Sequence, residues 1–264
     1  MGRRGVPPEV TRLLFPLEAL LSGLVWIGVL IATVLFTLLM LPLYGLRPLL
    51  DPDLRMAHEV SGLWGRFLIR MAPGCRVKVW GREHLERLPP GRPVILMANH
   101  QSYVDVPILY FLRWQFKWLA DEALFQIPFF GWSMRMAGYV PVRRGDADQA
   151  RWALEQARHW LSRGISIFVF PEGTRSHTGT FGRFQSGGFR LAIATKSPIL
   201  PVVMIGTRQL LPRGSWFFRI GVIPQIHILP PIVPTGNLDQ VHRLARKVRA
   251  EMEKVYAQHL KELR

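Results

Sequence analysis

From residue 77 to the C-terminus, short apolar runs alternate with segments that have the spacing of amphipathic helices. The apolar runs predict strands at residues 77–80, 94–97, 117–119, 139–142, 165–170, 199–204, 217–221 and 225–228. Helices are expected between them, including residues 149–161 and a charged amphipathic helix at 241–263. This alternation predicts an α/β domain at residues 75–264, with a mixed, largely parallel sheet flanked by helices.

An uncharged, apolar run covers residues 19–46, which is longer than the ~20 residues needed to cross the hydrocarbon core of a bilayer. The core of a secretory signal peptide is shorter, about 7–15 apolar residues. Length and all-round apolarity therefore favour a membrane helix over a buried core helix. Whether this helix spans the bilayer or is re-entrant stays open, and basic residues on both flanks leave its orientation open.

The next segment, residues 53–71, has the pattern of an amphipathic helix, with basic residues beside Trp64 and Phe67. A position at a lipid interface and simple packing against the α/β domain explain this pattern equally well. Residues 1–74 are thus predicted to form an N-terminal, membrane-associated helical region.

Composition narrows the classes of partner. The chain has 264 residues, with 34 Lys and Arg against 18 Asp and Glu and a net charge of +16, which indicates an anionic partner such as nucleic acid or lipid headgroups. Nucleic acid is disfavoured, because no zinc-finger, KH or RNP motif accompanies the basic residues. The lone Cys75 excludes an intramolecular disulfide and an all-cysteine metal site.

A candidate general base lies at the turn between the predicted strand 94–97 and a helix, in Asn99-His-Gln-Ser-Tyr-Val-Asp105. On a regular helix His100 and Asp105 would be roughly 140° apart, so they can meet only if His100 ends the loop and Asp105 begins the helix. A carboxylate behind the imidazole fixes its tautomer and stabilises its conjugate acid, as proton removal from a hydroxyl requires. The alternative is a capping box, in which Asp105 merely accepts from a free backbone amide near Ser102.

A candidate anion site follows the predicted strand 165–170, in Phe170-Pro-Glu-Gly-Thr-Arg-Ser176. Loops that leave parallel strands at the same edge of a sheet can converge on one crevice. Gly173 would let the backbone approach a ligand, and Arg175 offers the planar donor set that suits a phosphate. The alternative is an ordinary turn with a surface arginine.

Other chemistries lack their motifs: there is no Gly-x-Ser-x-Gly elbow, phosphate-binding P-loop or His-Glu-x-x-His pair. No covalent serine or cysteine nucleophile is indicated and no metal is expected, so His100 remains as the candidate base. If the reaction passes through an oxyanion, backbone amides near Val142 or after His100 are the candidate donors.

Together, Asn-His-x-Ser-x-x-Asp and Phe-Pro-Glu-Gly-Thr-Arg-Ser resemble the glycerolipid acyltransferase family, specifically bacterial 1-acyl-glycerol-3-phosphate acyltransferases. Two further blocks, at residues 127–142 and 199–203, match in order, so the resemblance covers about residues 91–206. It implies transfer of a fatty acyl group from a thioester to the sn-2 hydroxyl of lysophosphatidic acid, with His100 as base and Asp105 as its partner. It also implies a pair of N-terminal helices that anchors the enzyme to the bacterial inner membrane, with the catalytic domain on the cytoplasmic side.

On this basis the acceptor's phosphate is expected to bind the loop of Glu172, Gly173, Thr174 and Arg175, with Arg144, Arg143 and Lys117 as additional cations. Glu172 is expected to order the loop rather than to perform chemistry. The donor is acyl-CoA or acyl-acyl-carrier-protein as a co-substrate, without a resident cofactor, and the sequence does not decide between the two.

The chain departs from the family at Asp121, where many relatives have a basic residue, and at Arg143, where they have an acid. If the two positions face each other, the charges have been exchanged. Gln185 also stands where relatives often have Lys. Another lyso-lipid acceptor, such as a lyso-ornithine lipid or lysophosphatidylcholine, is therefore a second hypothesis, and a non-catalytic lipid-binding protein is a third.

Overall fold

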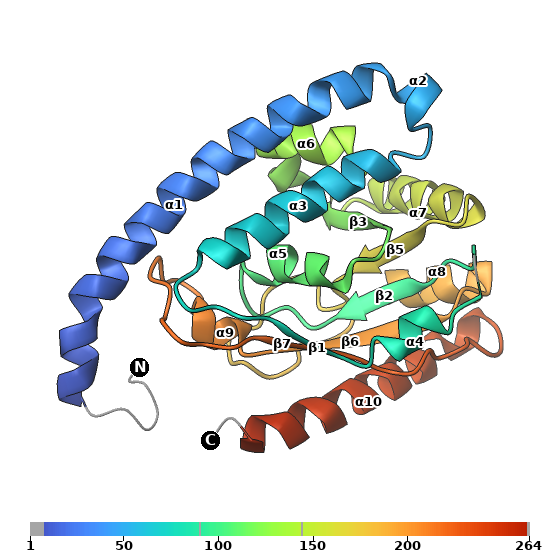
Figure 1. The fold of residues 1–264 in the computed structure, drawn as a ribbon. Coiled ribbons are helices and arrows are strands. Elements are labelled where there is room, and N and C mark those ends of the chain that lie inside the picture. The colour runs from blue at the N-terminus through green and yellow to red at the C-terminus, as the bar shows by residue number, and fades with distance from the viewer. Residues whose placement is uncertain (1–7, 90, 144, 263–264) are drawn as a thin grey trace.

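The computed structural model describes residues 8–89, 91–143 and 145–262, and it has one central sheet with helices on both faces (Figure 1). The described residues form seven strands in the order β1-β7-β6-β2-β5-β3-β4. Their bounds are β1 Lys78–Trp80, β2 Ile95–Ala98, β3 Phe116–Asp121, β4 Val140–Val142, β5 Ser166–Val169, β6 Ile199–Ile205 and β7 Gln225–Ile228. The β6–β7 pair is antiparallel, whereas all other neighbouring pairs are parallel, so the predicted mixed, largely parallel sheet is confirmed.

Alternating side chains of the central strands fill two separate cores. Leu96, Phe168 and Val202 face a core completed by helices α3 (Arg55–Met71), α5 (Asp105–Leu109) and α6 (Phe130–Met136). Met97, Val169 and Val203 face the opposite core, completed by α7 (Ala147–Ser162), α8 (Gly187–Thr195) and α10 (Val241–Glu262). Because both faces of β2, β5 and β6 are covered, these strands are apolar apart from the buried Ser166 of β5.

Short helices complete the chain: α2 Arg47–Leu50, α4 Glu83–Glu86, η1 Tyr110–Leu112, η2 Glu122–Gln126, α9 Thr207–Leu210 and η3 Leu238–Gln240. At the sheet's edge, β4 contains Pro141, which has no amide to donate and is tolerated there because one side of an edge strand is unpaired.

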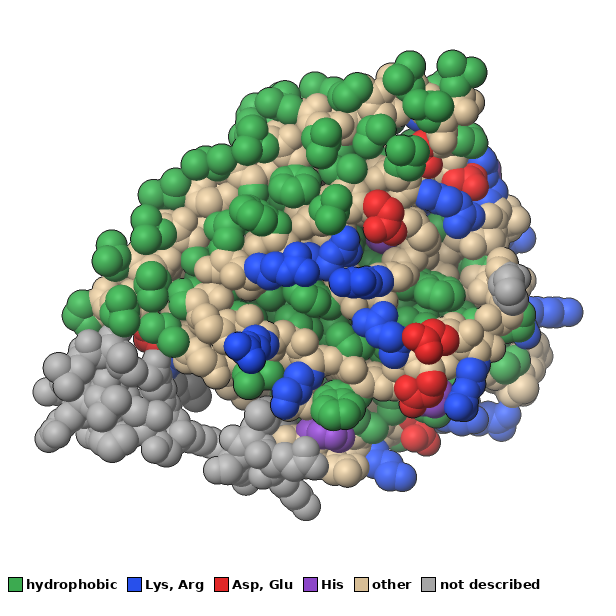
Figure 2. Space-filling view, in the orientation of Figure 1, with side chains coloured by type: hydrophobic (Ala, Val, Ile, Leu, Met, Phe, Trp, Pro, Cys, Tyr) green, Lys and Arg blue, Asp and Glu red, His purple; other side chains and the backbone are tan. Residues whose placement is uncertain are grey.

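The N-terminal helix α1, Pro8–Gly45, curves along the outside of the domain instead of projecting from it (Figure 1). The distribution of polar and apolar side chains on α1 is the reverse of that on a surface helix of a soluble protein. Ser22 and Thr37 are buried against the domain, whereas Leu20, Leu24 and Leu30 are 58–69% exposed. Figure 2 shows hydrophobic side chains along this edge of the molecule.

The inner side of α1 is held by contacts with several parts of the domain. The Thr37 hydroxyl lies 3.2 Å from the carbonyl oxygen of Phe129, and the Trp64 indole of α3 donates to Thr33. Helix α3, predicted as amphipathic, buries Ala57, Val60 and Ile69 against the domain's core. The predicted division near residue 74 falls in the connection between α3 and β1.

One predicted strand is wrong: residues 217–221 form no strand, and two of their backbone amides bond to α1. The amide of Phe218 donates to the Ser22 hydroxyl at 2.8 Å, and that of Ile220 donates to the Glu18 carboxylate at 3.2 Å. The Phe217 ring lies edge-on against Phe15 at 5.2 Å. The apolar run therefore reflects packing against a helix and not a place in the sheet.

Candidate active site

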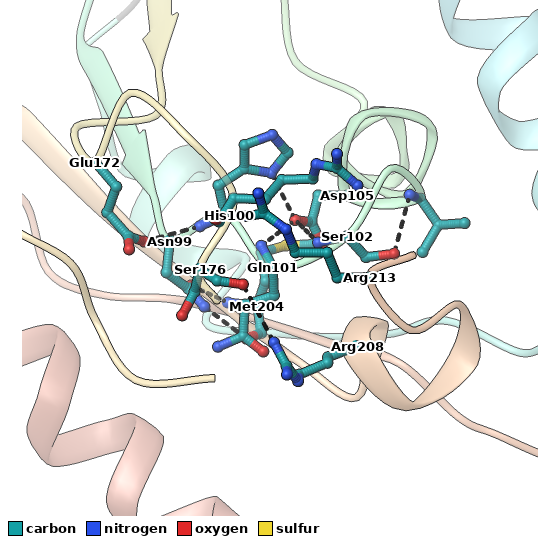
Figure 3. Close-up of polar contacts among 12 residues, drawn as sticks. Asn99, His100, Gln101, Ser102, Asp105, Glu172, Ser176, Met204, Arg208 and Arg213 are labelled. Atoms are coloured by element: carbon teal, nitrogen blue, oxygen red, sulfur yellow. Dashed lines mark hydrogen bonds and ion pairs between the residues drawn. The ribbon is translucent and has the colours of Figure 1, made fainter. Parts of the chain in front are cut away.

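His100 and Asp105 lie together where β2 ends and α5 begins. The imidazole Nδ1 of His100 is 2.8 Å from Oδ2 of Asp105, and the Asp105 side chain is fully buried (Figure 3). An imidazole that carries a proton on Nδ1 donates it to this carboxylate, which leaves Nε2 as the acceptor. Among the described residues Nε2 has no hydrogen-bond partner, and the His100 side chain is 17% exposed.

The same oxygen of Asp105 also accepts from two backbone amides, Gln101 at 2.6 Å and Ser102 at 2.8 Å. The alternative that Asp105 would accept from an amide near Ser102 is therefore also observed, and the two roles share one oxygen. Because these two amides bind Asp105, they are not free to donate to an oxyanion. The other carboxylate oxygen, Oδ1, is buried and has no hydrogen-bond partner within the described part of the chain.

The Phe170 ring supports the imidazole from one side. The rings of His100 and Phe170 are stacked, with centroids 4.0 Å apart and planes inclined by 13°. Trp118 of β3 stacks in turn on Phe170 at 5.5 Å. The imidazole is therefore held by the Asp105 carboxylate at Nδ1 and by the Phe170 ring on one face. The sequence pattern alone gave no signal for this stack.

Glu172 joins the two motif loops. Its Oε1 accepts from the amide of His100 at 3.0 Å, and its Oε2 accepts from the amide of Gly182 at 2.6 Å. A second link is the bond from the amide of Ser176 to the carbonyl oxygen of His100, 2.7 Å long. Burial raises the pKa of Glu172, while the two amide bonds act in the opposite direction. The loops that were expected to converge from parallel strands are therefore directly bonded.

Arg175 lies beside the His100 loop. Its guanidinium carbon is 3.5 Å from the centre of the Tyr103 ring, an arrangement in which the ring holds the flat face and the N–H groups at the edge stay available. Gly173 has φ of +70°, a conformation that favours glycine, so it is required by the turn that precedes Arg175. Thr174 is exposed in the same turn.

Two arginines that the sequence analysis did not select bind backbone carbonyl oxygens of the Arg175 loop. Arg208 donates to the carbonyl oxygens of Ser176 and His177, at 3.1 and 2.9 Å, and Arg213 donates to that of Arg175 (Figure 3). Three successive carbonyls of the loop are thus bound by side chains from the segment that follows β6. No motif in the sequence marks these arginines.

Polar side chains also fix the start of the His100 loop. The Asn99 amide pairs with both backbone groups of Met204 in β6: it donates to the carbonyl oxygen at 3.0 Å and accepts from the amide at 2.7 Å. The Ser102 hydroxyl donates to the carbonyl oxygen of Leu211 at 2.7 Å. Gln101 donates to the Tyr256 hydroxyl of α10 at 2.8 Å.

The structure does not place Lys117 in this group. Lys117 is fully buried, and its ammonium nitrogen bonds to the carbonyl oxygens of Leu54 and Ala137, at 2.8 and 2.9 Å. Burial lowers the pKa of Lys117 to about 7. We therefore remove Lys117 from the predicted phosphate ligands, because its donors are used inside the core. Arg144 lies outside the described residues.

Arg143 and Asp121 border one pocket of about 400 Å³, together with Glu122, Ala123 and Gln126. Arg143 forms its shorter ion pair with Glu122, whose two oxygens it contacts at 2.5 and 2.8 Å, and a longer one of 3.7 Å with Asp146. The hypothesis of an exchanged Asp121 and Arg143 pair is therefore revised, since the carboxylate opposite Arg143 is that of Glu122. This pair lowers the pKa of Glu122 and raises that of Arg143.

The chain is similar to known acyltransferases. Residues 76–205 match the family model described as "Acyltransferase". The chain is 35% identical over 191 residues to a 1-acyl-sn-glycerol-3-phosphate acyltransferase of Chlamydomonas reinhardtii, with 72% of this chain and 56% of the relative covered. It is 36% identical over 169 residues to a chloroplastic enzyme of the same name from Arabidopsis thaliana, with 63% and 46% covered. The chain thus spans about half the length of these curated relatives.

A solved structure extends the similarity to almost the whole chain. The crystal structure of the 1-acyl-sn-glycerophosphate acyltransferase PlsC from Thermotoga maritima superposes with a TM-score of 0.75 at 26% identity, covering 91% of this chain and 96% of that one. The predicted resemblance is confirmed, and the chain belongs to the acyltransferase family.

Proposed function

We propose that this protein transfers a fatty acyl group from an acyl thioester to the sn-2 hydroxyl of lysophosphatidic acid, which gives phosphatidic acid. The observation that carries the proposal is the His100–Asp105 contact of 2.8 Å, with Nε2 turned away from the carboxylate. The names of the relatives and of the similar crystal structure support the choice of acceptor.

In the proposed reaction Nε2 of His100 takes the proton of the acceptor hydroxyl while the hydroxyl oxygen attacks the thioester carbonyl. The tetrahedral intermediate then collapses, the carbon–sulfur bond breaks, and the thiolate leaves. A thiol of pKa near 8.5 is a far better leaving group than an alkoxide, and it recovers the proton from the imidazolium. Asp105 stabilises that imidazolium, and no covalent enzyme intermediate is needed.

The Arg175 guanidinium is the proposed ligand of the acceptor's phosphate, because Tyr103 holds its face and leaves its edge for two phosphate oxygens. Glu172 and Gly173 act on the shape of this loop, and Thr174 lies at its exposed tip. Arg143 is the weaker candidate since Glu122 already neutralises it. Arg144 stays a prediction.

We further infer that the protein works on a membrane. Residues Phe15–Gly45 form a helix with a mean hydropathy of 2.7 in its most apolar window, of which 22% is buried. The domain covers one side of this helix from Ser22 to Thr37, and the other side presents leucines to the surroundings. Such a helix fits an orientation along one leaflet, with its exposed leucines among the acyl chains. A position on the cytoplasmic side of a bacterial inner membrane stays a prediction.

The test is an acyl-transfer assay in detergent with acyl-CoA and acyl-acyl-carrier-protein as alternative donors. The acceptors are lysophosphatidic acid, lysophosphatidylcholine and a lyso-ornithine lipid. We expect turnover of lysophosphatidic acid, and near-complete loss of it in His100→Ala with lipid binding retained. The matched control is His242→Ala, which removes an exposed imidazole of α10.

If the protein prefers a zwitterionic acceptor, that lyso-lipid and not lysophosphatidic acid is the substrate. Unchanged activity of His100→Ala would contradict the mechanism. Absence of turnover with every donor and acceptor, with lipid binding intact in both variants, would favour a non-catalytic lipid-binding protein.

A further inference from the structure

The segment between α9 and β7 connects the apolar surface of α1 with both motif loops. The amide of Arg219 donates to the carbonyl oxygen of Leu210 at 2.9 Å, which closes residues 210–219 into a compact loop. We call residues 210–219 the aromatic loop, and we call its three consecutive aromatic residues, Trp216, Phe217 and Phe218, its tip. It belongs neither to the four sequence blocks of the family nor to the N-terminal helices.

Two of the three aromatic side chains at the tip are exposed: Trp216 by 69% and Phe217 by 40%, whereas Phe218 is buried. Exposure of two large neighbouring aromatic side chains is costly in water, and it usually marks a contact surface.

This tip is continuous with the apolar surface of α1. The Trp216 ring lies edge-on to Trp26 at 5.3 Å, and the Trp26 indole donates to the carbonyl oxygen of Trp216. Phe217 contacts Phe15, which is itself 51% exposed. A single apolar surface thus runs from the exposed residues of α1 onto the aromatic loop.

Near its other end, the aromatic loop is bonded to both motif loops through Leu211 and Arg213. The carbonyl oxygen of Leu211 accepts from the Ser102 hydroxyl, which belongs to the His100 loop. Arg213 donates to the carbonyl oxygen of Arg175. Arg213, which donates to the Arg175 loop, is therefore only three positions from Trp216, the most exposed aromatic side chain of the tip.

We propose that Trp216 and Phe217 are a second lipid contact, which enters the bilayer interface beside α1 and fixes the Arg175 loop when the protein is on a membrane. The inference rests on the proposed membrane function. The bilayer is the occupant that fits, because the tip continues the exposed apolar surface of α1, a helix long and apolar enough to cross a membrane. Aromatic rings with a polar edge prefer the headgroup level of a bilayer.

The contact is tested with an environment-sensitive fluorophore attached to Trp216→Cys in a Cys75→Ser background, with vesicles of phosphatidylcholine and phosphatidylglycerol. Leu24→Cys on the exposed side of α1 is the positive control, and Arg151→Cys on α7 is the negative one. We expect the label to enter lipid at positions 216 and 24 and to stay in water at 151. Entry at 24 without entry at 216 overturns the inference. Failure at both positions would overturn the membrane placement as well, while leaving the acyl-transfer test unaffected.

The effect on the site is tested with Trp216→Ala/Phe217→Ala. We expect kcat/KM to fall about tenfold for lysophosphatidic acid in vesicles, as the loss of one or two buried aromatic contacts implies. With a short-chain acceptor below its micelle concentration, kcat/KM should stay at the wild-type value. An equal fall of kcat/KM in vesicles and with the short-chain acceptor would mean that the two side chains only support the fold. Thermal unfolding followed by circular dichroism would detect such a loss of stability independently.

Discussion

The Glu172 carboxylate accepts a hydrogen bond from the backbone amide of His100, 3.0 Å away, although 72 residues separate the two along the chain. Its second oxygen accepts from the amide of Gly182. Glu172 therefore lies at the junction of three segments and determines where His100 stands relative to the Arg175 loop. The sequence analysis expected a loop-ordering role for Glu172, and these two bonds are the contacts on which that role would depend.

Glu172→Gln should destabilise the protein by about 1–3 kcal/mol and lower kcat, because one of the two amides then faces an N–H group and is left without an acceptor. The free energy of unfolding from urea titration measures the first effect, and steady-state kinetics the second. Glu251→Gln, which changes an exposed carboxylate of α10, is the control. Wild-type stability of Glu172→Gln would contradict the assigned role.

Asp105→Asn should reduce kcat by about 10³-fold or more while the fold is retained, since an amide cannot stabilise the imidazolium and can reverse the tautomer of His100. The asparagine oxygen can still accept from Gln101 and Ser102. Acyl transfer and a thermal unfolding curve, measured on the same preparation, separate chemistry from stability. A loss of less than about tenfold would mean that Asp105 serves chiefly as an amide acceptor.

Arg175→Met should reduce kcat/KM for lysophosphatidic acid by about 10- to 150-fold, the range that charge-assisted hydrogen bonds to a phosphate account for. With a lyso-lipid that lacks a phosphate, the loss should be much smaller. The ratio of the two kcat/KM values is the measured quantity. Arg151→Met, on exposed α7, is the control, and an equal loss for both acceptors would argue against a phosphate ligand.

Lys117 should make the stability of the protein depend on pH. Its pKa is lowered by burial from 10.5 to about 7, so between these values the unfolded chain binds more protons than the folded one. Stability should therefore rise with pH across this window, by at most about 1.4 kcal/mol per pH unit, and fall as the pH drops towards 7. Lys117→Met should lose this slope in urea titrations at several pH values. An unchanged slope would show that Lys117 keeps an ordinary pKa.

The sequence predicted the sheet well because the buried strands are apolar and bounded by turns. Seven of the eight predicted strands exist in the described residues, from β1 to β7. The exception, residues 217–221, has a strand's composition, yet its aromatic side chains pack against α1. Composition cannot distinguish a sheet neighbour from a helix neighbour, since both bury the same side chains.

The site was predictable where spacing implies contact and unpredictable where folding brings distant segments together. His100 and Asp105 are five residues apart, so a bend between strand and helix suffices to join them. Arg208 and Arg213 act on backbone carbonyls of another loop, a contact that leaves no pattern in the sequence. Lys117 was misassigned because a cation in a strand looks the same whether it faces a ligand or the carbonyl oxygens of the core.

The pairing of Asn99 with Met204 has a mechanical consequence. Because the side-chain amide of Asn99 occupies both polar backbone groups of Met204 in β6, the residue that precedes the proposed base His100 is fixed to a central strand of the sheet. The proposed reaction brings two long acyl chains to the site, and the backbone of His100 is also bonded to Glu172 and Ser176, which opposes a movement of His100. We expect the accommodation to fall on the outer segments, so that the substrates adjust to His100 and not the reverse.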